Sequence, residues 1–234
     1  MKRFVGTLLV SLALAGAAHA ADFSQAAAPS WSAASWNGLY AGVTGGYSWG
    51  QADFTTPLSV PASLNMSGGL LGLQAGYDFD LGNRLVLGIA GDASWGSITG
   101  DTCVENGGCS PPTPDDSYAN GKIDWLGTLR ARLGFTNGNA LIYATGGAAY
   151  AHSTATISNV TGLGDTWSAS KGSWGWAIGG GGEVKLSRHV SVGAEALYVD
   201  LGTTNYDFSD GGAPTTVPVK VTDSILRAFI NYRF

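Results

Sequence analysis

The chain has 234 residues and a formal net charge of −5; 36 residues are glycine, 11% are aromatic and only 12% are charged. Average proteins contain about 7% glycine and about 25% charged residues, so this composition does not fit a typical cytosolic α/β enzyme. The hydrophobic share of 44% is too high for a disordered chain, and the glycines lack the three-residue period of collagen.

The first twenty residues have the pattern of a secretory signal peptide. Lys2 and Arg3 precede an apolar stretch, and Ala18-His19-Ala20 then matches an A-x-A cleavage site. The apolar stretch is shorter than the about 20 residues that a spanning helix needs. We therefore expect a cleaved signal peptide at 1–20, followed by a flexible periplasmic linker at 21–35 that is rich in alanine and serine.

From residue 36 onward, hydrophobic residues alternate with polar or small ones, which is typical of β-strands with one apolar face. In the last such segment Leu226 and Ile230 share one face, whereas Arg227 lies on the other. The alternation predicts eight strands, at 37–50, 66–80, 84–100, 122–136, 139–156, 172–186, 188–202 and 220–234. Because an even number of strands can close without leaving an edge, we expect an all-β fold, an eight-stranded antiparallel up-and-down barrel.

The predicted connections are of two kinds, which alternate along the chain. Three are short turns, at 81–83, 137–138 and 187. Four are long, at 51–65, 101–121, 157–171 and 203–219. Short turns at one end and long loops at the other are typical of outer-membrane barrels. We therefore expect three periplasmic turns and four extracellular loops.

Two cysteines, Cys103 and Cys109, flank a short glycine-containing segment in the second long connection. In an oxidising compartment such a pair is expected to form a disulfide. Two thiols without a nearby histidine are a poor zinc site, since zinc usually takes four ligands.

Aromatic residues gather at both ends of the apolar face. Near the long connections these are Trp49, Trp95, Trp125, Trp174 and Trp176, with Tyr150 and Tyr198. Near the short turns they are Tyr77, Phe79, Phe135, Tyr232 and Phe234. Two such aromatic girdles are selected by the two interfaces of a bilayer. The pattern favours a transmembrane barrel with its apolar face toward lipid over a soluble, lipocalin-type barrel.

The opposite face carries charges of both signs. The acidic residues are Asp78, Asp92, Asp124, Glu183, Glu195 and Asp223, and the basic residues are Arg130, Arg132, Lys185, Arg227 and Arg233. Because buried charges are costly unless paired, we expect an interior network of ion pairs and hydrogen bonds. Side chains fill an eight-stranded barrel, so a wide pore is not expected.

Four segments, Trp36–Gly42, Trp125–Gly134, Tyr143–Gly147 and Glu195–Gly202, resemble the small outer-membrane immunogenic proteins of alphaproteobacteria. These are porin-like eight-stranded barrels of the OmpA-like membrane-domain class. The resemblance implies an outer-membrane barrel at 36–234, in a family that includes porins, surface antigens, haem binders and envelope tethers. The terminal Asn231–Phe234 resembles the aromatic C-terminal signal read by the barrel assembly machinery, which implies an assembly role for Phe234 and Tyr232.

The function favoured by these patterns is a structural or surface-contact role in the outer membrane, and the alternative is a narrow channel of low selectivity. A haem-binding or lipid-modifying barrel is a less favoured alternative. An enzyme is not expected. His189-Val190-Ser191 has the spacing of a lipid A deacylase pair, but it lies at the periplasmic end, whereas lipid A occupies the outer leaflet. His152 has no convincing partner for acid–base chemistry.

No cofactor is expected, because the long connections offer only Tyr118, Tyr206 and the marginal Met66 as haem ligands. The same connections carry eight acidic residues against Lys171, which disfavours nucleic acid. The expected partners are outer-membrane lipids, lipopolysaccharide and, during biogenesis, the assembly machinery. We expect a monomer.

Overall fold

The computed structural model describes residues 35–55, 61–103, 118–158, 166–208 and 215–234. The predicted signal peptide, and the predicted linker up to residue 34, lie outside these ranges. The described residues form eight β-strands: β1 (Gly38–Thr55), β2 (Pro61–Gly82), β3 (Leu85–Cys103), β4 (Tyr118–Asn137), β5 (Ala140–Ser158), β6 (Thr166–Lys185), β7 (Val190–Phe208) and β8 (Thr215–Arg233).

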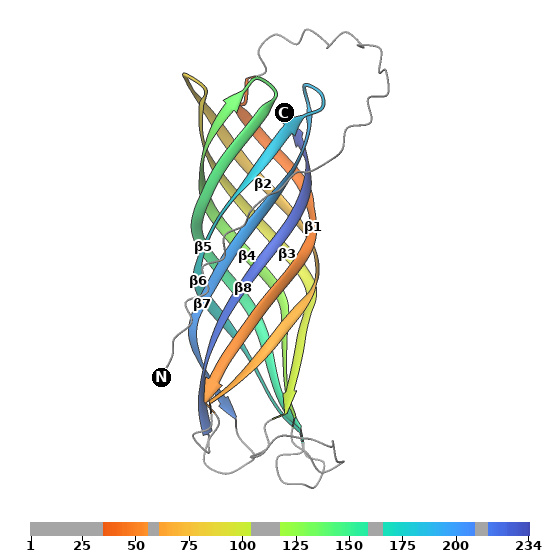
Figure 1. Cartoon of the computed structure of the whole chain (residues 1–234), viewed down its shortest axis with the longest axis vertical. Helices are drawn as coiled ribbons and strands as arrows, with labels where there is room; N and C mark the ends of the chain where they lie inside the picture. The colour runs from red at the N-terminus through yellow and green to blue at the C-terminus, as the bar shows by residue number, and fades with distance from the viewer. Residues whose placement is uncertain (1–34, 56–60, 104–117, 159–165, 209–214) are drawn as a thin grey trace, which may run out of the picture. The chain divides into compact units, whose positions relative to one another are not determined.

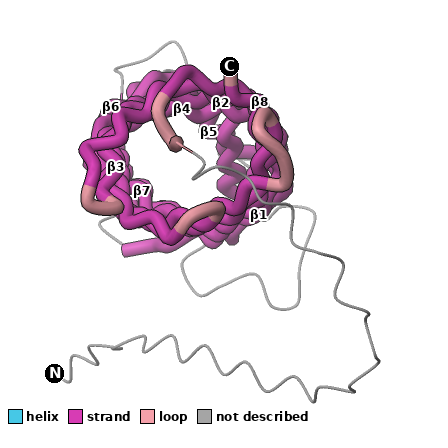
Figure 2. Tube along the Cα trace, turned by 90° about the horizontal axis from the view of Figure 1, so that it is seen from above, coloured by secondary structure: helices cyan, strands magenta, loops and turns pink. Residues whose placement is uncertain are grey.

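Each strand pairs antiparallel with its neighbours in the chain, and β8 pairs with β1 to close the ring (Figure 1). Figure 2 shows the ring of strands along the barrel axis. The backbone amide of Phe234 donates to the carbonyl of Leu39, next to the last β1–β8 pair. The predicted eight-stranded up-and-down barrel is confirmed. Among the described residues, no helix is long and apolar enough to cross a membrane.

Three tight turns join β2 to β3, β4 to β5 and β6 to β7, where the sequence predicts them. Asn83 and Arg84 have φ angles of 50° and 67°, the left-handed conformation that a two-residue hairpin with matching twist requires. Gly138 takes the same conformation, with φ of 64°. We call this end of the barrel the turn end and the opposite end the loop end.

The strands are longer at the loop end than predicted. β1 continues to Thr55 instead of ending at residue 50, and β2 begins at Pro61 instead of residue 66. β7 likewise extends to Phe208, beyond the predicted 202. The gaps between strands are therefore only 56–60, 104–117, 159–165 and 209–214.

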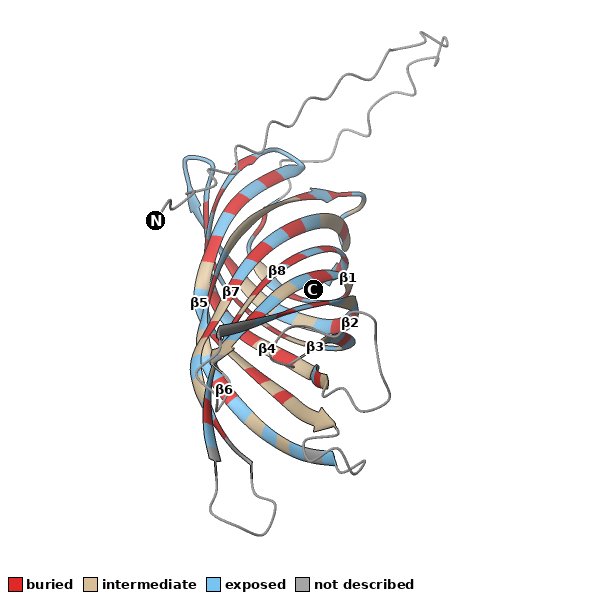
Figure 3. Ribbon diagram, turned by 60° about the horizontal axis from the view of Figure 1, so that its bottom comes forward, coloured by how far each residue is buried: buried red, intermediate tan, exposed pale blue. Residues whose placement is uncertain are grey.

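Buried and exposed residues alternate along the strands (Figure 3). Near the loop end, however, the residues that face inward change from polar to apolar. From the turn end to the aromatic residues near the loop end, apolar side chains face outward; Leu71 is 72% exposed and Ile142 is 66% exposed. Beyond them the inner wall is apolar, with Leu64 and Met66 each 4% exposed, and polar side chains such as Asn65 are exposed.

We call this reversed part the rim; it comprises 51–54, 63–67, 97–103, 118–124, 152–158, 168–173, 202–206 and 216–222. The reversal explains why the sequence pattern ended the strands too early. In the rim the polar residues face outward, and the few apolar residues are separated by Ser, Thr and Asn. Such a strand has the composition of a loop.

Candidate functional site in the barrel interior

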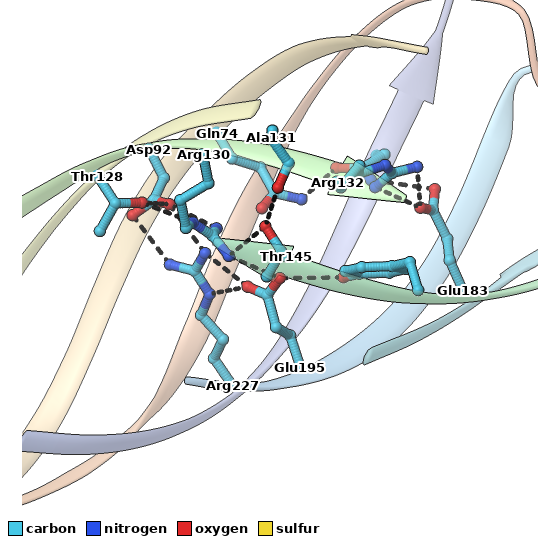
Figure 4. Close-up of polar contacts among 12 residues, drawn as sticks. Gln74, Asp92, Thr128, Arg130, Ala131, Arg132, Thr145, Glu183, Glu195 and Arg227 are labelled. Carbon is cyan, nitrogen blue, oxygen red and sulfur yellow. Dashed lines mark hydrogen bonds and ion pairs between the residues drawn. The ribbon is translucent and has the colours of Figure 1, made fainter. Parts of the chain in front are cut away.

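Charged side chains inside the barrel form two layers. In the central layer Arg130 Nη2 lies 2.9 Å from Asp92 Oδ1, and Arg130 Nη1 lies 2.9 Å from Glu195 Oε2. Arg227 contacts the same two carboxylates, at 2.9 Å and 2.8 Å. These four side chains come from β3, β4, β7 and β8 and are almost fully buried. Each arginine thus bridges both carboxylates (Figure 4).

The second layer lies toward the turn end. Arg132 contacts Asp78 at 2.7 Å and Glu183 at 3.2 Å, and Arg233 contacts the same carboxylates at 2.9 Å and 2.8 Å. Arg130 and Arg132 are two residues apart on β4, so both point inward. The result is a pair of charge-balanced layers, each with two arginines and two carboxylates.

Neutral polar groups complete the central layer. The Thr128 hydroxyl donates to Asp92 Oδ1 at 2.5 Å and accepts a hydrogen bond from Arg130 Nε at 2.8 Å. The Tyr143 hydroxyl donates to Glu195 at 3.2 Å. Since an unsatisfied buried carboxylate is costly, these donors help to stabilise the buried layer.

In the second layer, Glu183 Oε1 accepts hydrogen bonds from the Ser191 hydroxyl at 2.6 Å and from Asn231 Nδ2 at 3.2 Å. The Arg132 guanidinium lies between two rings, 5.0 Å from the centroid of Tyr40 and 4.7 Å from that of Tyr143. A guanidinium over an aromatic face gains cation–π attraction, which is stronger where water is excluded.

Trp36, just before β1, covers the second layer at the turn end. Its side chain is 1% exposed, its ring centroid lies 4.6 Å from the Arg233 guanidinium carbon and 4.7 Å from Lys185 Nζ, and its indole N–H donates to the Gly138 carbonyl at 3.1 Å. Lys185 Nζ also donates to the Ser35 carbonyl at 2.5 Å. Trp36 therefore closes the interior from this side.

Replacing Trp36 with phenylalanine is expected to lower the free energy of unfolding by about 1 kcal/mol, because the aromatic ring stays while the indole N–H bond to Gly138 is lost. Urea unfolding followed by tryptophan fluorescence measures this change. The matched control is Trp174→Phe, at a 73% exposed position on the outer wall, where we expect a change within about 0.5 kcal/mol. Equal losses in the two variants would contradict the covering role of Trp36.

Sequence reasoning missed the interior roles of Trp36, Tyr40 and Tyr143. The alternation of β1 already placed Tyr40 on the inner face, opposite Leu39. The inward glycines leave the space that these side chains occupy: a Cβ on Gly76 would lie 2.4 Å from the Tyr40 hydroxyl, and one on Gly88 would lie 2.3 Å from Asp78 Oδ1.

The prediction that Asp124 belongs to the interior network is wrong. Asp124 lies at an irregularity in the β4–β5 pairing between Ile123 and Trp125. An extra residue at such a bulge reverses the alternation, so Ile123 is 3% exposed inside the barrel. Asp124 instead pairs with Lys122 at 2.8 Å and His152 at 3.5 Å, and all three side chains are at least one-third exposed.

Asp223 lies inside the barrel, but outside both layers. Its carboxylate oxygens accept hydrogen bonds from the Ser48 hydroxyl at 2.5 Å and 2.6 Å. Within the described part of the chain no cationic group lies within 4 Å of it. Asp223 therefore forms a separate polar pair between the central layer and the rim.

The predicted girdle residues lie on the outer wall. Trp49, Trp95 and Trp176 are each about half exposed. Rings on neighbouring strands contact one another: the centroids of Trp125 and Tyr150 are 5.2 Å apart, and those of Tyr150 and Trp174 are 4.9 Å apart. Near the turn end Tyr232 and Phe234 form a similar pair at 5.1 Å, and Phe234 is 71% exposed.

The candidate catalytic residues His189 and Ser191 are not brought together, whereas Met66 and Tyr206, two of the candidate haem ligands, both line a cavity near the loop end. Ser191 is fully buried and donates to Glu183, whereas His189 lies in the turn before β7 and stacks on Tyr232 on the outer wall. Tyr206 belongs to β7, not to a loop, and its hydroxyl lies 2.6 Å from that of Ser153 inside the barrel. The described residues contain no cluster of three or more metal-ligating side chains.

Cys103 ends β3 and is disulfide-bonded. Its predicted partner, Cys109, lies outside the described residues.

Residues 7–226 match the protein family described as "Outer membrane protein beta-barrel domain". The chain belongs to this family. It is 34% identical over 218 residues to the 31 kDa outer-membrane immunogenic protein of Brucella melitensis, covering 86% of this chain and 84% of that protein. It is 28% identical over 184 residues to the 22 kDa outer membrane protein of Rhizobium leguminosarum, covering 79% and 73%.

The fold is similar to the crystal structure of OprG from Pseudomonas aeruginosa, with a TM-score of 0.54 and 16% identity over 85% of this chain and 96% of that one. The predicted family, an outer-membrane barrel of alphaproteobacterial type, is confirmed. The protein is located in the outer membrane of a Gram-negative bacterium. Because short turns face the periplasm in barrels of this class, the turn end is the periplasmic side and the loop end is the extracellular side.

Membrane location explains where the chemistry of the wall reverses. The outward apolar run of β1, from Leu39 to the aromatic Trp49, is about as long as the 9–11 residues that a tilted strand needs to cross a bilayer. Residues beyond Trp49 extend past the lipid on the extracellular side. There the outer wall meets water, so polar residues face out and apolar residues pack inside.

Proposed function

We propose that the protein is a closed, non-conducting barrel with a structural or surface-contact role, which holds its polar rim above the outer membrane. The observation that carries this proposal is the filled interior. Four arginines and four carboxylates, all nearly fully buried, cross the lumen in two layers. Trp36 covers the periplasmic side of these layers, and an apolar cluster that includes Leu70, Leu126 and Ile225 packs on the extracellular side.

Planar-bilayer recording with the purified protein tests this proposal. We expect no steady openings, because an ion would have to displace paired guanidinium and carboxylate groups in both layers. Gel mobility with and without boiling first shows that the sample is folded, and a general porin serves as the positive control. Steady, reproducible openings would overturn the proposal in favour of a narrow channel of low selectivity.

The proposal includes no enzymatic activity and no cofactor. Two observations support the absence of enzymatic activity from this proposal. His189 lies on the outer wall whereas Ser191 is buried, and the side chain of His152 is 39% exposed beside Asp124. Overexpression is expected to leave the mass of lipid A and of its acyl chains unchanged. A modified lipid A would show that the barrel acts on its surrounding lipid.

The proposed partners are outer-membrane lipids, lipopolysaccharide and the barrel assembly machinery, and the folded protein is proposed to be a monomer. The outer wall supports the lipid contact: an apolar band lies between rings of exposed aromatic residues, as bilayer interfaces select. Cross-linking in outer-membrane fractions measures the oligomeric state. A dominant cross-linked dimer would contradict the monomer.

Replacing Phe234 with alanine is expected to reduce the amount of folded barrel in the outer membrane, because the exposed terminal ring would be lost as an assembly signal. Purified Phe234→Ala protein should still refold in detergent, since the backbone bond from residue 234 to Leu39 remains. Phe135→Ala is the matched control, a 45% exposed aromatic near the same end of the barrel. If both variants lost folded barrel equally, Phe234 would act only as an aromatic girdle residue and not as an assembly signal.

A further inference from the structure

The rim contains a cavity that the proposed function does not use. Its volume is about 70 Å³. Residues from six strands line it, among them Phe54 of β1, Met66 of β2, Ile123 of β4, Ala155 of β5, Tyr206 of β7 and Val217 of β8. The cavity therefore lies inside the barrel, on the extracellular side of both charged layers.

The lining offers a ligand apolar contact but few hydrogen bonds. The inward polar groups, Ser153 and Tyr206, bond to each other at 2.6 Å. Four further polar residues border the cavity. Asn120 and Lys122 alternate with inward residues and are exposed on the outer wall. The hydroxyls of Thr154 and Thr156 are hydrogen-bonded to those of Ser170 and Ser168, at 3.0 Å and 3.3 Å. A charged or strongly polar ligand would lose its hydration here without replacement, so the cavity favours an uncharged apolar group.

Apolar side chains pack on the side of the cavity that faces the charged layers. Its lining residues Ala52, Ile123 and Val221 belong to a continuous apolar cluster that extends down the lumen to Leu126 and Ile225. On β8, Arg227 of the central ion-pair layer follows two residues after Ile225 on the same inner face. Packed apolar side chains therefore lie between the cavity and the central ion-pair layer.

The position of the cavity determines the side from which a ligand enters. The outer wall at this level is polar, with Asp53, Asn65 and Lys122 exposed, so an apolar molecule does not reach the cavity sideways from lipid. The lining extends to Tyr206 and Val217, close to the extracellular ends of β7 and β8. The end of the cavity nearest Tyr206 and Val217 therefore faces the extracellular side.

The volume limits the size of the ligand. An engineered apolar cavity of about 150 Å³ holds benzene, and this one has about half that volume. We propose that the rim cavity binds small uncharged apolar molecules from the extracellular medium, with room for an unbranched chain of about three or four carbons. This inference is independent of whether the barrel conducts.

Met66 provides a direct reporter of binding. The chain has two methionines, Met1 and Met66; Met66 lines the cavity and is 4% exposed. Protein with ¹³C-labelled methionine methyl groups is reconstituted in lipid nanodiscs, and the Met66 methyl signal is followed by NMR. Xenon and a series of 1-alkanols, from ethanol to 1-hexanol, are the probes.

Xenon is expected to shift the Met66 signal in a saturable manner. For the alkanols, affinity should rise about fourfold with each added methylene and should level off once the chain is longer than the cavity. Partition into the lipid also increases with chain length, but it is not saturable at Met66. A linear shift, or no shift, would overturn the proposal.

A matched pair of substitutions on β5 tests the location. Ala155→Leu adds the same side chain to the cavity that Ala148→Leu adds to the lipid-facing wall. We expect saturable binding to be lost in Ala155→Leu and retained in Ala148→Leu. Gel mobility with and without boiling verifies folding, and Ala52→Leu fills the cavity from β1 if Ala155→Leu does not fold. Binding that persists in a folded, filled variant would overturn the proposal.

Discussion

Replacing Arg227 with methionine is expected to lower the free energy of unfolding by about 3–5 kcal/mol, the usual loss when one partner of a buried ion pair is removed. The Arg227 side chain is 2% exposed and contacts Asp92 and Glu195 within 3.0 Å. Without it, two buried carboxylates share the single charge of Arg130. Urea unfolding of the protein in lipid vesicles, followed by tryptophan fluorescence, measures the loss.

Two further variants isolate the cause of this loss. Arg188→Met makes the same change in an exposed periplasmic turn, where we expect a change within about 0.5 kcal/mol. Adding Glu195→Gln to Arg227→Met restores charge balance in the central layer and is expected to recover part of the stability. If the double variant were instead about 3–5 kcal/mol less stable than Arg227→Met, the charge-balance explanation would be wrong.

Gly147→Ala is expected to lower the free energy of unfolding by about 3 kcal/mol, near the upper end of typical overpacking costs. A Cβ on Gly147 would lie 2.1 Å from the Leu129 carbonyl oxygen and 2.7 Å from Arg130 Cα on the neighbouring strand. Both are backbone atoms, so β4 would have to move. That movement would also displace the Arg130 guanidinium from its two carboxylates.

Gly146→Ala is the control for this prediction, one residue earlier on the same strand. A Cβ there would meet nothing closer than the Ala177 carbonyl oxygen at 3.6 Å. Its stability should stay within about 0.5 kcal/mol of the parent or rise slightly, since alanine has less freedom to lose on folding. Similar losses at Gly146 and Gly147 would show that close strand approach is not the constraint.

The sequence predicted the barrel and most of the charged interior because the membrane part obeys a strict period of two. Arg130, Arg132, Arg227 and Arg233 all lie inside the barrel, as their alternation indicated. Asp124 was misplaced because a bulge shifts the period by one residue. The hydrophobic alternation of one strand does not show where its pairing with the next strand is irregular, so the sequence did not predict this bulge.

The rim was missed for a different reason. The rule that polar residues face inward holds only where lipid surrounds the wall. Beyond Trp49 the surroundings are water, and the same alternation then has the opposite meaning. The aromatic residues near the long connections mark the height at which the membrane ends, but the residues beyond them were interpreted as loops. The contacts of Trp36 could not be predicted from the sequence either. The hydrogen bond of its indole N–H to Gly138, for example, joins residues 102 positions apart.

The long sequence separation of the interior ion pairs has a consequence for biogenesis. Arg227 on β8 meets Asp92 on β3 across 135 residues, and Arg233 meets Asp78 across 155. In a half-formed sheet these groups would face hydrocarbon without a counter-charge, at a cost of several kcal/mol for each ion. Intermediates that hold only some hairpins in the bilayer are therefore expected to be less stable than the closed barrel.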